Sequence, residues 1–253
     1  MMNQKASDLG LTSTQFKSPH GLDSDEHFTT AHELALITDY ALKNETFSKI
    51  VSTKNYTVNI NGKSKTLHNT NELLGYLDGV YGVKTGFTNG ANRCLVTSCK
   101  RGNLDIICVV LGCDTKKDRG LDSIKLINYI FNNFSVVNVK DILNEDFSNW
   151  KSQNSESFSI NKGISQSLEL FIDESQIPYE TIAINSNSLD DIYTSFEVAY
   201  KFDAPLKENT KIGTIEINLG EKSLFSVDIL NKTTIKRKNI FYYLQSFMNF
   251  DLL

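Results

Sequence analysis

Apolar positions in the first part of the chain follow a helical spacing, which gives way to alternation after residue 54. Residues 1–9 have the pattern of an amphipathic helix, and the polar stretch from Gly10 to Phe28 indicates an ordered loop. Thr30 and Glu33 are typical of a capping box, in which each side chain accepts a hydrogen bond from the other residue's amide. A short helix over 45–51 follows the helix that this pair predicts. The inner face of the first of these two helices carries Leu34, Ile37, Thr38, Ala41 and Leu42.

The alternating stretches predict two β-hairpins. Residues 55–67 alternate on either side of Asn61-Gly62, a dipeptide that favours a tight hairpin turn. Strands near 92–99 and 104–112 form the second hairpin. A long amphipathic helix over 116–134 follows, because apolar side chains recur there every three or four positions. They are Leu121, Ile124, Ile127, Ile130 and Phe131.

Beyond Phe134 the composition changes. Residues 144–162 are rich in Asn and Ser and indicate a linker. Several short strands follow at regular spacing, a pattern typical of a sandwich or a barrel. They cover residues 168–172, 181–184, 196–200, 214–219 and 225–230. The second half therefore predicts a small all-β domain, roughly residues 137–235.

The last residues, 236–253, have a pattern of their own. A basic cluster at Lys236, Arg237 and Lys238 precedes an apolar helical face. That face consists of Ile240, Leu244, Phe247 and Met248. A short helix of this kind lies flat in a membrane interface or docks on its own β domain, and the pattern leaves both open.

Composition and charge narrow the class of protein. The 253 residues include 26 Lys and Arg against 30 Asp and Glu. The resulting net charge of −4 is not the basic balance that is typical of nucleic-acid-binding proteins. No run of about 18 or more apolar residues predicts an ordinary transmembrane helix. The four cysteines lack the spacing of common zinc sites and are expected as small buried thiols in adjacent strands. They are Cys94, Cys99, Cys108 and Cys113.

The segment most suggestive of chemistry is Lys84-Thr85-Gly86, within a glycine-rich stretch from 78 to 91. A lysine places positive charge beside the binding site of an anionic chain end, and a threonine hydroxyl can donate to its carboxylate. Glycine has no Cβ, so a substrate backbone can lie against the strand. The amide of the next residue, Phe87, can then point at a developing oxyanion. These residue types therefore fit acyl transfer.

A three-residue motif recurs by chance, but further segments accompany this one. They are Asn3-Gln4-Lys5-Ala6, Pro19-His20-Gly21-Leu22-Asp23, Asn69-Thr70-Asn71-Glu72-Leu73-Leu74 and Ala204-Pro205-Leu206-Lys207. With them the chain resembles the low-molecular-mass penicillin-binding proteins, which are serine-type D-alanyl-D-alanine carboxypeptidases. The resemblance implies a partial α/β (α+β) penicillin-binding or β-lactamase-like transpeptidase domain at 1–136. It further implies a small all-β sandwich domain at 137–235 and a membrane-associating amphipathic helix at 236–253.

By position, the resemblance assigns roles to the motif. Lys84 would hold the hydrogen-bond network around the nucleophile, and the Phe87 N–H would form half of the oxyanion hole. Thr85 would bind the carboxylate of the terminal D-Ala. Gly86 and Thr88 would complete the substrate-binding strand.

The same resemblance implies the partners and the location. The substrate would be the pentapeptide of peptidoglycan, and β-lactam antibiotics would bind the intact enzyme. The C-terminal helix would contact the membrane surface from an extracytoplasmic, peripheral location, and no nucleic acid, cofactor or metal would be involved. At one position the chain departs from the family, since some members have Arg where this chain has Thr70. The substitution removes one expected contact to the substrate carboxylate.

The family order is Ser-x-x-Lys, then Ser-x-Asn, then Lys-Thr-Gly, and residues 1–83 contain no Ser-x-x-Lys. Later matches are compositional coincidences in a Ser- and Asn-rich stretch: Ser148 with Lys151, Ser159 with Lys162, and Ser152-Gln153-Asn154. The chain is therefore expected to be the C-terminal part of such an enzyme, to lack the nucleophile and to be inactive alone. Its Lys-Thr-Gly strand is expected in the interior of a sheet completed by the missing part.

Two other classes of protein fit parts of the sequence. A noncatalytic cell-envelope binding protein could retain the same scaffold to bind peptidoglycan or a partner. A metal-dependent hydrolase could use a set of four side chains, His20, His27, His32 and Glu33. No His-Glu-x-x-His motif is present, so structural or solvent-facing histidines are the simpler interpretation.

Overall fold

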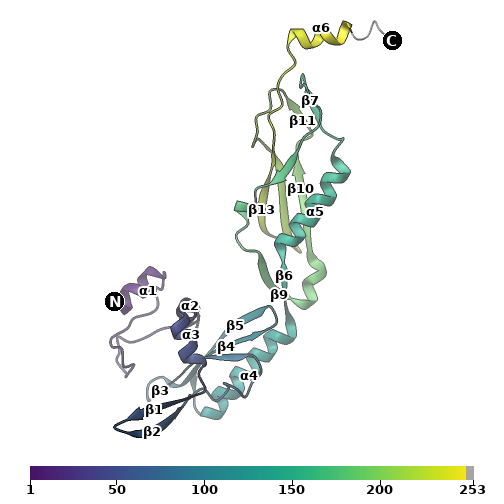
Figure 1. The fold of residues 1–253 in the computed structure, drawn as a ribbon. Helices are drawn as coiled ribbons and strands as arrows, with labels where there is room; N and C mark the ends of the chain where they lie inside the picture. Colours follow the sequence, from purple (N-terminus) through teal and green to yellow (C-terminus); the bar gives the residue numbers. More distant parts are fainter. Residues whose placement is uncertain (249–253) are drawn as a thin grey trace. The chain divides into compact units, whose positions relative to one another are not determined.

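The computed structural model describes the backbone of residues 1–248 and the side chains of residues 1–245. The chain divides into two compact units, Met1–Phe134 and Ser135–Leu253. Figure 1 shows the course of the chain through both units. Each unit has an apolar core of its own.

The N-terminal unit combines helices with two antiparallel sheets. Its elements are α1 (Met2–Asp8), α2 (Ala31–Leu42), α3 (Glu45–Ser52), β1 (Asn55–Ile60), β2 (Lys63–His68), β3 (Val80–Thr88), β4 (Asn92–Arg101), β5 (Leu104–Cys113) and α4 (Lys116–Asn133). β3, β4 and β5 form one sheet in that order, and among the described residues β1 and β2 pair only with each other. Both predicted hairpins and the predicted helices of this unit are confirmed.

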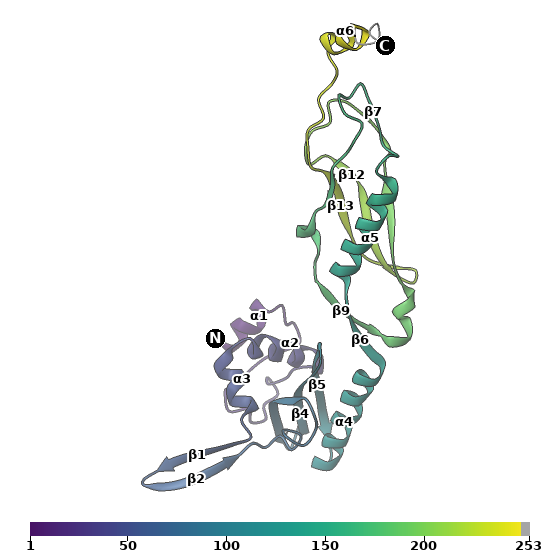
Figure 2. The ribbon, with the colours of Figure 1, turned by 45° about the vertical axis from the view of Figure 1, so that its right-hand side comes forward.

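The β1–β2 hairpin turns at Asn61 and Gly62, whose φ angles of 52° and 74° lie in the left-handed region. A two-residue turn of this kind matches the right-handed twist of the paired strands, and asparagine and glycine tolerate positive φ. The hairpin projects away from the three-stranded sheet and from α2 and α3 (Figures 1 and 2).

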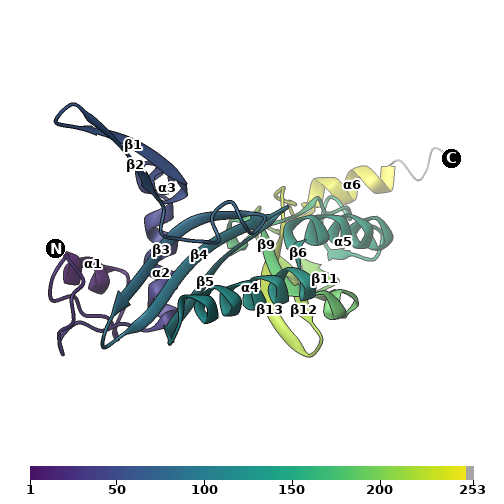
Figure 3. The same ribbon diagram turned by 90° about the horizontal axis from the view of Figure 1, so that it is seen from below.

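One face of the three-stranded sheet packs against α4, which runs along β5 (Figure 3). Leu95 on β4 and Ile127 on α4 have 0% exposed surface, and so does Cys99. Cys108 is buried as well, and burial raises the pKa of its thiol to about 11. All four cysteines are free thiols, and these two are buried in adjacent strands as predicted.

The predicted capping box at the start of α2 forms only in part. The Thr30 hydroxyl accepts a hydrogen bond from the Glu33 amide at 3.1 Å, as an N-cap does. The Glu33 carboxylate does not return to the Thr30 amide. It accepts instead from two backbone amides and one hydroxyl, those of Thr12, Ser13 and Thr14. Three donors stabilise a charged acceptor more than one amide does, so Glu33 fastens the preceding loop to α2.

The C-terminal unit is built around a four-stranded antiparallel sheet with the order β10-β12-β13-β8. Its elements are β6 (Phe134–Asn138), α5 (Val139–Asn154), β7 (Ser159–Asn161), β8 (Leu170–Ile172), β9 (Thr181–Asn185), β10 (Ile192–Val198), β11 (Lys201–Asp203), β12 (Lys211–Leu219), β13 (Lys222–Asn231) and α6 (Ile240–Met248). The central strands contribute fully buried side chains, namely Ile215, Ile217, Val227 and Ile229. The predicted β domain is confirmed, although it also contains a helix that the sequence pattern missed.

That helix is α5, and the predicted linker at 144–162 is wrong because α5 occupies much of it. The Asn138 side chain caps α5 by accepting from the amides at the second and third helical positions. Val139, Leu143 and Phe147 are spaced by four residues and are buried in the same core as the sheet. The polar residues that suggested a linker are exposed, among them Asn144, Ser148 and Asn149.

The last described helix, α6, exposes apolar side chains at Ile240, Phe241 and Leu244. Two members of the predicted apolar face, Phe247 and Met248, lie beyond the described side chains, and residues 249–253 of the predicted membrane-associating segment lie outside the described residues. None of the helices within residues 1–248 combines the length and the hydropathy of a membrane-spanning segment.

Candidate active site

The Lys-Thr-Gly motif lies on β3, at one edge of the three-stranded sheet. β3 pairs with β4 through Thr85 opposite Leu95 and Gly86 opposite Cys94, and within residues 1–248 it has no strand on its other side. β4 and then β5 lie on one side of β3, so its other edge is open in the described residues, and a sheet completed there by further strands stays a prediction. An edge strand leaves a row of backbone N–H and C=O groups free, which a peptide can use to bind alongside.

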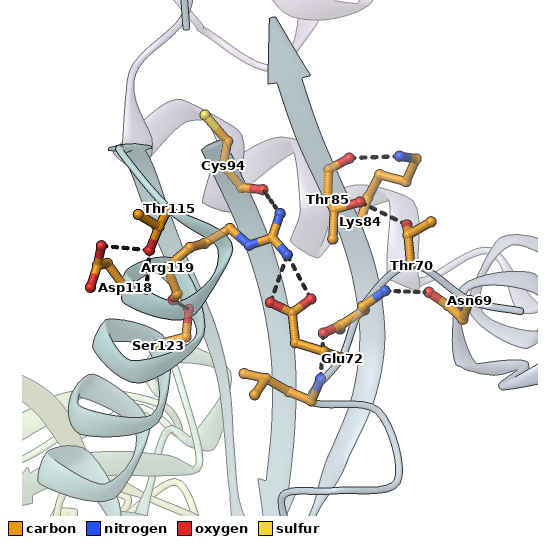
Figure 4. Close-up of polar contacts among 12 residues, drawn as sticks. Asn69, Thr70, Glu72, Lys84, Thr85, Cys94, Thr115, Asp118, Arg119 and Ser123 are labelled. Carbon is orange, nitrogen blue, oxygen red and sulfur yellow. Dashed lines mark hydrogen bonds and ion pairs between the residues drawn. The ribbon is translucent and has the colours of Figure 1, made fainter. Parts of the chain in front are cut away.

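Residues 69–71 form a rigid support beside β3 (Figure 4). The Asn69 side chain donates to two backbone carbonyl oxygens at the end of α3, both at 3.1 Å. The buried Asn71 side chain donates to the Gly82 carbonyl oxygen on β3 at 2.7 Å. Both asparagines are thus fixed by backbone groups, so the residue between them, Thr70, is held in place.

The hydroxyl oxygens of Thr70 and Thr85 lie 2.7 Å apart and share a hydrogen bond (Figure 4). One hydroxyl donates to the other, so the pair keeps one proton that can be donated to a further acceptor such as a carboxylate. The Lys84 ammonium donates to the Thr85 carbonyl oxygen at 2.6 Å. A positive charge and a hydroxyl donor therefore meet on the same stretch of β3.

The fold does not require glycine at position 86. A Cβ added to Gly86 would lie 3.6 Å from the Cys94 Cβ, an ordinary contact. A Cβ at Gly82 on the same strand would lie 2.8 Å from the Ser98 Oγ, which is too close. Gly82 is needed for packing, whereas the space above Gly86 is open to a molecule that approaches from outside.

The turn after β3 is tied to the N-terminal loop. The Gly90 amide donates to the Asp23 carboxylate at 3.2 Å. The Ala91 amide donates to the Thr88 hydroxyl at 2.9 Å. Thr88 therefore closes the turn, and its own hydroxyl proton remains available to another acceptor.

A pocket of about 730 Å³ brings these groups together. It is lined by all five predicted site residues: Lys84, Thr85, Gly86, Phe87 and Thr88. The other wall comes mainly from the loop before α2, including His20 and Asp23, and all lining residues belong to the N-terminal unit. A cavity of this size suits a small ligand or a short peptide.

Two arginines near the motif were not singled out from the sequence. The Arg93 guanidinium lies 4.1 Å from the centre of the Phe87 ring, which is itself 54% exposed. Arg119 is 3% exposed and binds Glu72, and it also donates to the Cys94 carbonyl oxygen at 3.4 Å (Figure 4). Arg119 lies on the buried face of α4, and a charged residue on such a face requires a partner. The position of Arg119 on the apolar face of the predicted helix is therefore the sequence feature that could have identified it.

Two of the histidines, His20 and His27, make local contacts, and His32 is exposed. The His20 Nδ1 accepts from the Leu22 amide at 3.1 Å and lies 3.1 Å from the Ser18 hydroxyl. The His27 ring stands edge-on to Phe16 at 5.8 Å. In the described part of the chain, no group of three or more His, Cys, Asp or Glu side chains is placed to hold a metal ion.

Lys-Thr-Gly on an open strand edge beside a peptide-sized pocket is the arrangement of the penicillin-binding and β-lactamase class. Comparison with known proteins narrows this class. Residues 1–115 match the Peptidase S11 family of D-alanyl-D-alanine carboxypeptidases, and residues 151–237 match the C-terminal domain of penicillin-binding protein 5. The chain belongs to the D-alanyl-D-alanine carboxypeptidase family of low-molecular-mass penicillin-binding proteins.

Individual relatives agree with this family. D-alanyl-D-alanine carboxypeptidase DacF from Bacillus subtilis is 28% identical over 98% of this chain and 61% of its own length. DacC from Escherichia coli is 32% identical over 88% of this chain and 52% of its own length. The crystal structure of penicillin-binding protein 5 from Haemophilus influenzae superposes with a TM-score of 0.62 at 26% identity, over 93% of this chain and 65% of that one. The chain thus spans between half and two thirds of the length of these relatives.

Proposed function

We propose that this chain supplies the substrate-binding strand and one oxyanion donor of a serine-type D-alanyl-D-alanine carboxypeptidase. The observation that carries the proposal is the Thr70–Thr85 hydroxyl pair on an open strand edge, next to the Lys84 ammonium. The substrate class is a peptide of peptidoglycan that ends in D-Ala-D-Ala. The relatives are carboxypeptidases by name, which favours an enzyme over a noncatalytic cell-envelope binding protein.

In this reaction a serine oxygen attacks the carbonyl carbon between the two D-Ala residues, the terminal D-Ala leaves, and water then hydrolyses the acyl-enzyme ester. The groups of this chain act on the substrate. Thr85 donates to the terminal carboxylate while Lys84 offsets its negative charge. The Phe87 N–H donates to the oxyanion of the tetrahedral intermediate. The open space at Gly86 lets the substrate backbone approach β3.

The proposal assigns the nucleophile to none of these 253 residues. Residues 1–83 contain no Ser-x-x-Lys. Two Ser-x-x-Lys matches occur later in the chain. One of them, Ser148 with Lys151, lies on α5, where the Lys151 ammonium donates to the Leu170 carbonyl oxygen at 2.8 Å. That bond holds the ammonium on the β domain, and a catalytic lysine would instead hydrogen-bond to the serine.

The proposal includes a location. Peptidoglycan lies outside the cytoplasmic membrane, so the site would act in an extracytoplasmic compartment. The exposed apolar residues Ile240, Phe241 and Leu244 of α6 follow a basic cluster at Lys236–Lys238. This combination supports peripheral contact with a membrane surface that contains anionic lipids.

A titration followed by NMR tests the carboxylate subsite. The peptide diacetyl-L-Lys-D-Ala-D-Ala is added to the isotope-labelled chain, and the amide shifts of residues 84–88 are recorded. We expect saturable shifts there, and about tenfold weaker binding of the same peptide with a C-terminal carboxamide, because it lacks the charge that Thr85 and Lys84 recognise. Equal binding of the acid and the amide would contradict the proposal.

Labelling with a fluorescent penicillin, followed by intact-mass analysis, tests the assignment of the chemistry. We expect penicillin to compete with the peptide for the subsite without forming a covalent adduct. A stoichiometric adduct would contradict the proposal as stated. Peptide mapping would then show whether Ser148 or Ser159 is the acylated residue.

A further inference from the structure

The β1–β2 hairpin sorts its side chains into two different faces, because cross-strand partners lie on the same face of an antiparallel ribbon. One face carries three neutral polar pairs: Asn55 with His68, Thr57 with Thr66, and Asn59 with Ser64. The other face, called the apolar-basic face below, carries three mixed pairs: Tyr56 with Leu67, Val58 with Lys65, and Ile60 with Lys63.

The polar face is satisfied within the hairpin. The Thr57 and Thr66 hydroxyls lie 3.0 Å apart, and the His68 Nδ1 lies 2.8 Å from the Asn55 side-chain oxygen. On the apolar-basic face the large side chains are exposed, with 64% for Tyr56, 56% for Ile60 and 45% for Leu67. A two-stranded ribbon is marginally stable alone in water, so an apolar face on such a ribbon is suited to binding a partner.

The charge of this region indicates the chemistry of that partner. From Thr46 to Asn71 the chain contains four lysines and no acidic residue, although the whole chain has a net charge of −4. Lys63 and Lys65 project from the apolar-basic face, two positions apart along β2. Lysines alternating with apolar side chains suit a ligand with spaced carboxylates and apolar stretches between them.

The base of the hairpin is continuous with the candidate active site. The Asn69 amide donates to the Lys54 carbonyl oxygen at 2.8 Å and closes the base. The next residue, Thr70, contacts the Thr85 hydroxyl. A six-residue strand such as β1 extends about 20 Å. A polymer with a chain end at Thr85 can therefore reach the ribbon with its neighbouring segments.

We infer that the apolar-basic face binds acidic peptides of the same peptidoglycan strand whose terminal D-Ala-D-Ala occupies the Thr85 subsite. The identity of this polymer rests on the proposed function. The carboxylates of the neighbouring peptides pair with Lys63 and Lys65, while their apolar parts and the sugar rings pack on Tyr56 and Leu67. The hairpin would thus favour polymeric substrate over free peptide.

Two other occupants fit the face less well. A bilayer entered by the hairpin tip would bury the polar residues Asn61, Lys63 and Ser64 together with Ile60, whereas Tyr56 and Leu67 lie at the far end of the ribbon. A second copy of the chain would bring the same basic face against itself, which like charges disfavour.

Co-sedimentation with purified peptidoglycan sacculi, stripped of protein and attached polymers, tests the inference. The whole chain is compared with the double variant Lys63→Gln/Lys65→Gln at low ionic strength, about 0.05 M. The matched control is Lys116→Gln/Lys117→Gln, which makes the same charge change at exposed positions of α4. We expect the hairpin variant to need about five to ten times more sacculi for half-saturation, while the control binds like the original chain.

A second hairpin variant, Tyr56→Ser, keeps the charge and is expected to weaken sacculus binding about threefold. Binding of all variants equal to that of the original chain would overturn the inference, and so would equal loss in hairpin and control variants. In a parallel experiment, the same variants are sedimented with phosphatidylglycerol vesicles in place of sacculi. A loss of vesicle binding in the hairpin variant with sacculus binding intact would assign the face to lipid instead.

Failure of the inference is distinguishable from failure of the proposed function. The small D-Ala-D-Ala peptide reports on the Thr85 subsite alone, because it is too short to reach the ribbon. If that peptide does not bind at residues 84–88 while sacculus binding still depends on Lys63 and Lys65, the proposed function fails and the hairpin surface stands. The reverse result leaves the subsite in place and removes the hairpin surface.

Discussion

Arg119 and Glu72, 47 residues apart in the sequence, form an ion pair in which one guanidinium nitrogen lies 2.6 Å from both carboxylate oxygens. Arg119 is 3% exposed, whereas the Glu72 side chain is 40% exposed. The pair joins α4 to the segment that presents Thr70 to β3. The carboxylate therefore both neutralises a buried charge and holds the segment that carries Thr70.

Removing the carboxylate should destabilise the N-terminal unit. We expect Glu72→Gln to lower the free energy of unfolding by about 2–3 kcal/mol, because Arg119 remains buried without a counter-charge. Urea denaturation followed by circular dichroism measures the change. The control is Lys43→Gln, which breaks an exposed pair with Asp39 and should cost less than about 0.5 kcal/mol. Equal effects of the two variants would show that burial of Arg119 does not matter.

Two glycines on the same strand should respond differently to alanine. In Gly82→Ala the new Cβ would lie 2.8 Å from the Ser98 Oγ, so we expect a loss of about 1–3 kcal/mol of stability. In Gly86→Ala the nearest contact is 3.6 Å, and stability should change by less than about 0.5 kcal/mol. The second variant should nevertheless bind the D-Ala-D-Ala peptide about tenfold more weakly, because the methyl group occupies the approach to β3. Denaturation and peptide titration of both variants separate the two effects.

The Thr70 hydroxyl should contribute to recognition of the peptide carboxylate through Thr85. We expect Thr70→Val to weaken binding of the D-Ala-D-Ala peptide about five- to tenfold, since the Thr85 hydroxyl then loses its partner at 2.7 Å. Thr70→Ser keeps the hydroxyl and should bind within about twofold of the original chain. If valine and serine have the same effect, the hydroxyl pair is not part of the subsite.

Glu33 should make the stability of the N-terminal unit pH-dependent. The hydrogen bond from the Thr14 hydroxyl, aided by the Ser13 and Thr12 amides, lowers the pKa of the Glu33 carboxyl below its ordinary value of 4.5. A carboxyl whose folded-state pKa is lowered adds stability above its unfolded-state pKa, and this is lost as the pH falls through the folded-state value. The melting temperature should therefore fall more steeply below pH 4.5 for the original chain than for Glu33→Gln. Parallel curves would contradict this role.

The cysteines should differ in reactivity. Thiolates rather than thiols react with alkylating agents, and burial raises the pKa of Cys99 and brings that of Cys108 to about 11. In the native chain at neutral pH, iodoacetamide should modify the half-buried Cys94 and, more slowly, Cys113, because burial and the nearby Asp122 and Asp118 carboxylates raise the pKa of the Cys113 thiol as well, while the buried pair stays unmodified. In denaturant all four cysteines should react. Mass spectrometry measures the number of alkylated cysteines in each case. Four adducts on the native chain at one rate would contradict the burial of Cys99 and Cys108.

Local signals account for the elements that were predicted correctly. Asn61-Gly62 supplies positive φ at both turn positions, so the hairpin follows from two residues and the alternation around them. The helix α4 follows from apolar spacing alone. α5 escaped prediction because its apolar positions are few and the polar residues between them dominate the composition. Its core contacts become visible only when the sheet is in place.

The residues of the candidate site can be predicted from the sequence, whereas the contacts that hold them in place cannot. Lys84, Thr85 and Gly86 were singled out because a short motif carries their chemistry. The contacts that hold them come from segments distant in sequence, such as the pairing of Thr70 with Thr85 and of Glu72 with Arg119. No local pattern encodes such pairs, since they form only after the strands and α4 have packed.

The family, the two hairpins, most of the helices and the Lys-Thr-Gly segment can be predicted from the amino-acid sequence, because each depends on periodicity, turn residues or short motifs within one stretch of chain. The neighbours of β3 and the partners of Glu33 follow from packing alone: among the described residues β3 has β4 on one side and no strand on the other, and the Glu33 carboxylate accepts from a loop instead of its own cap. Both outcomes depend on which backbone groups remain free after packing. A carboxylate or a strand edge takes the partners that the folded chain brings to it, and linear order does not specify them.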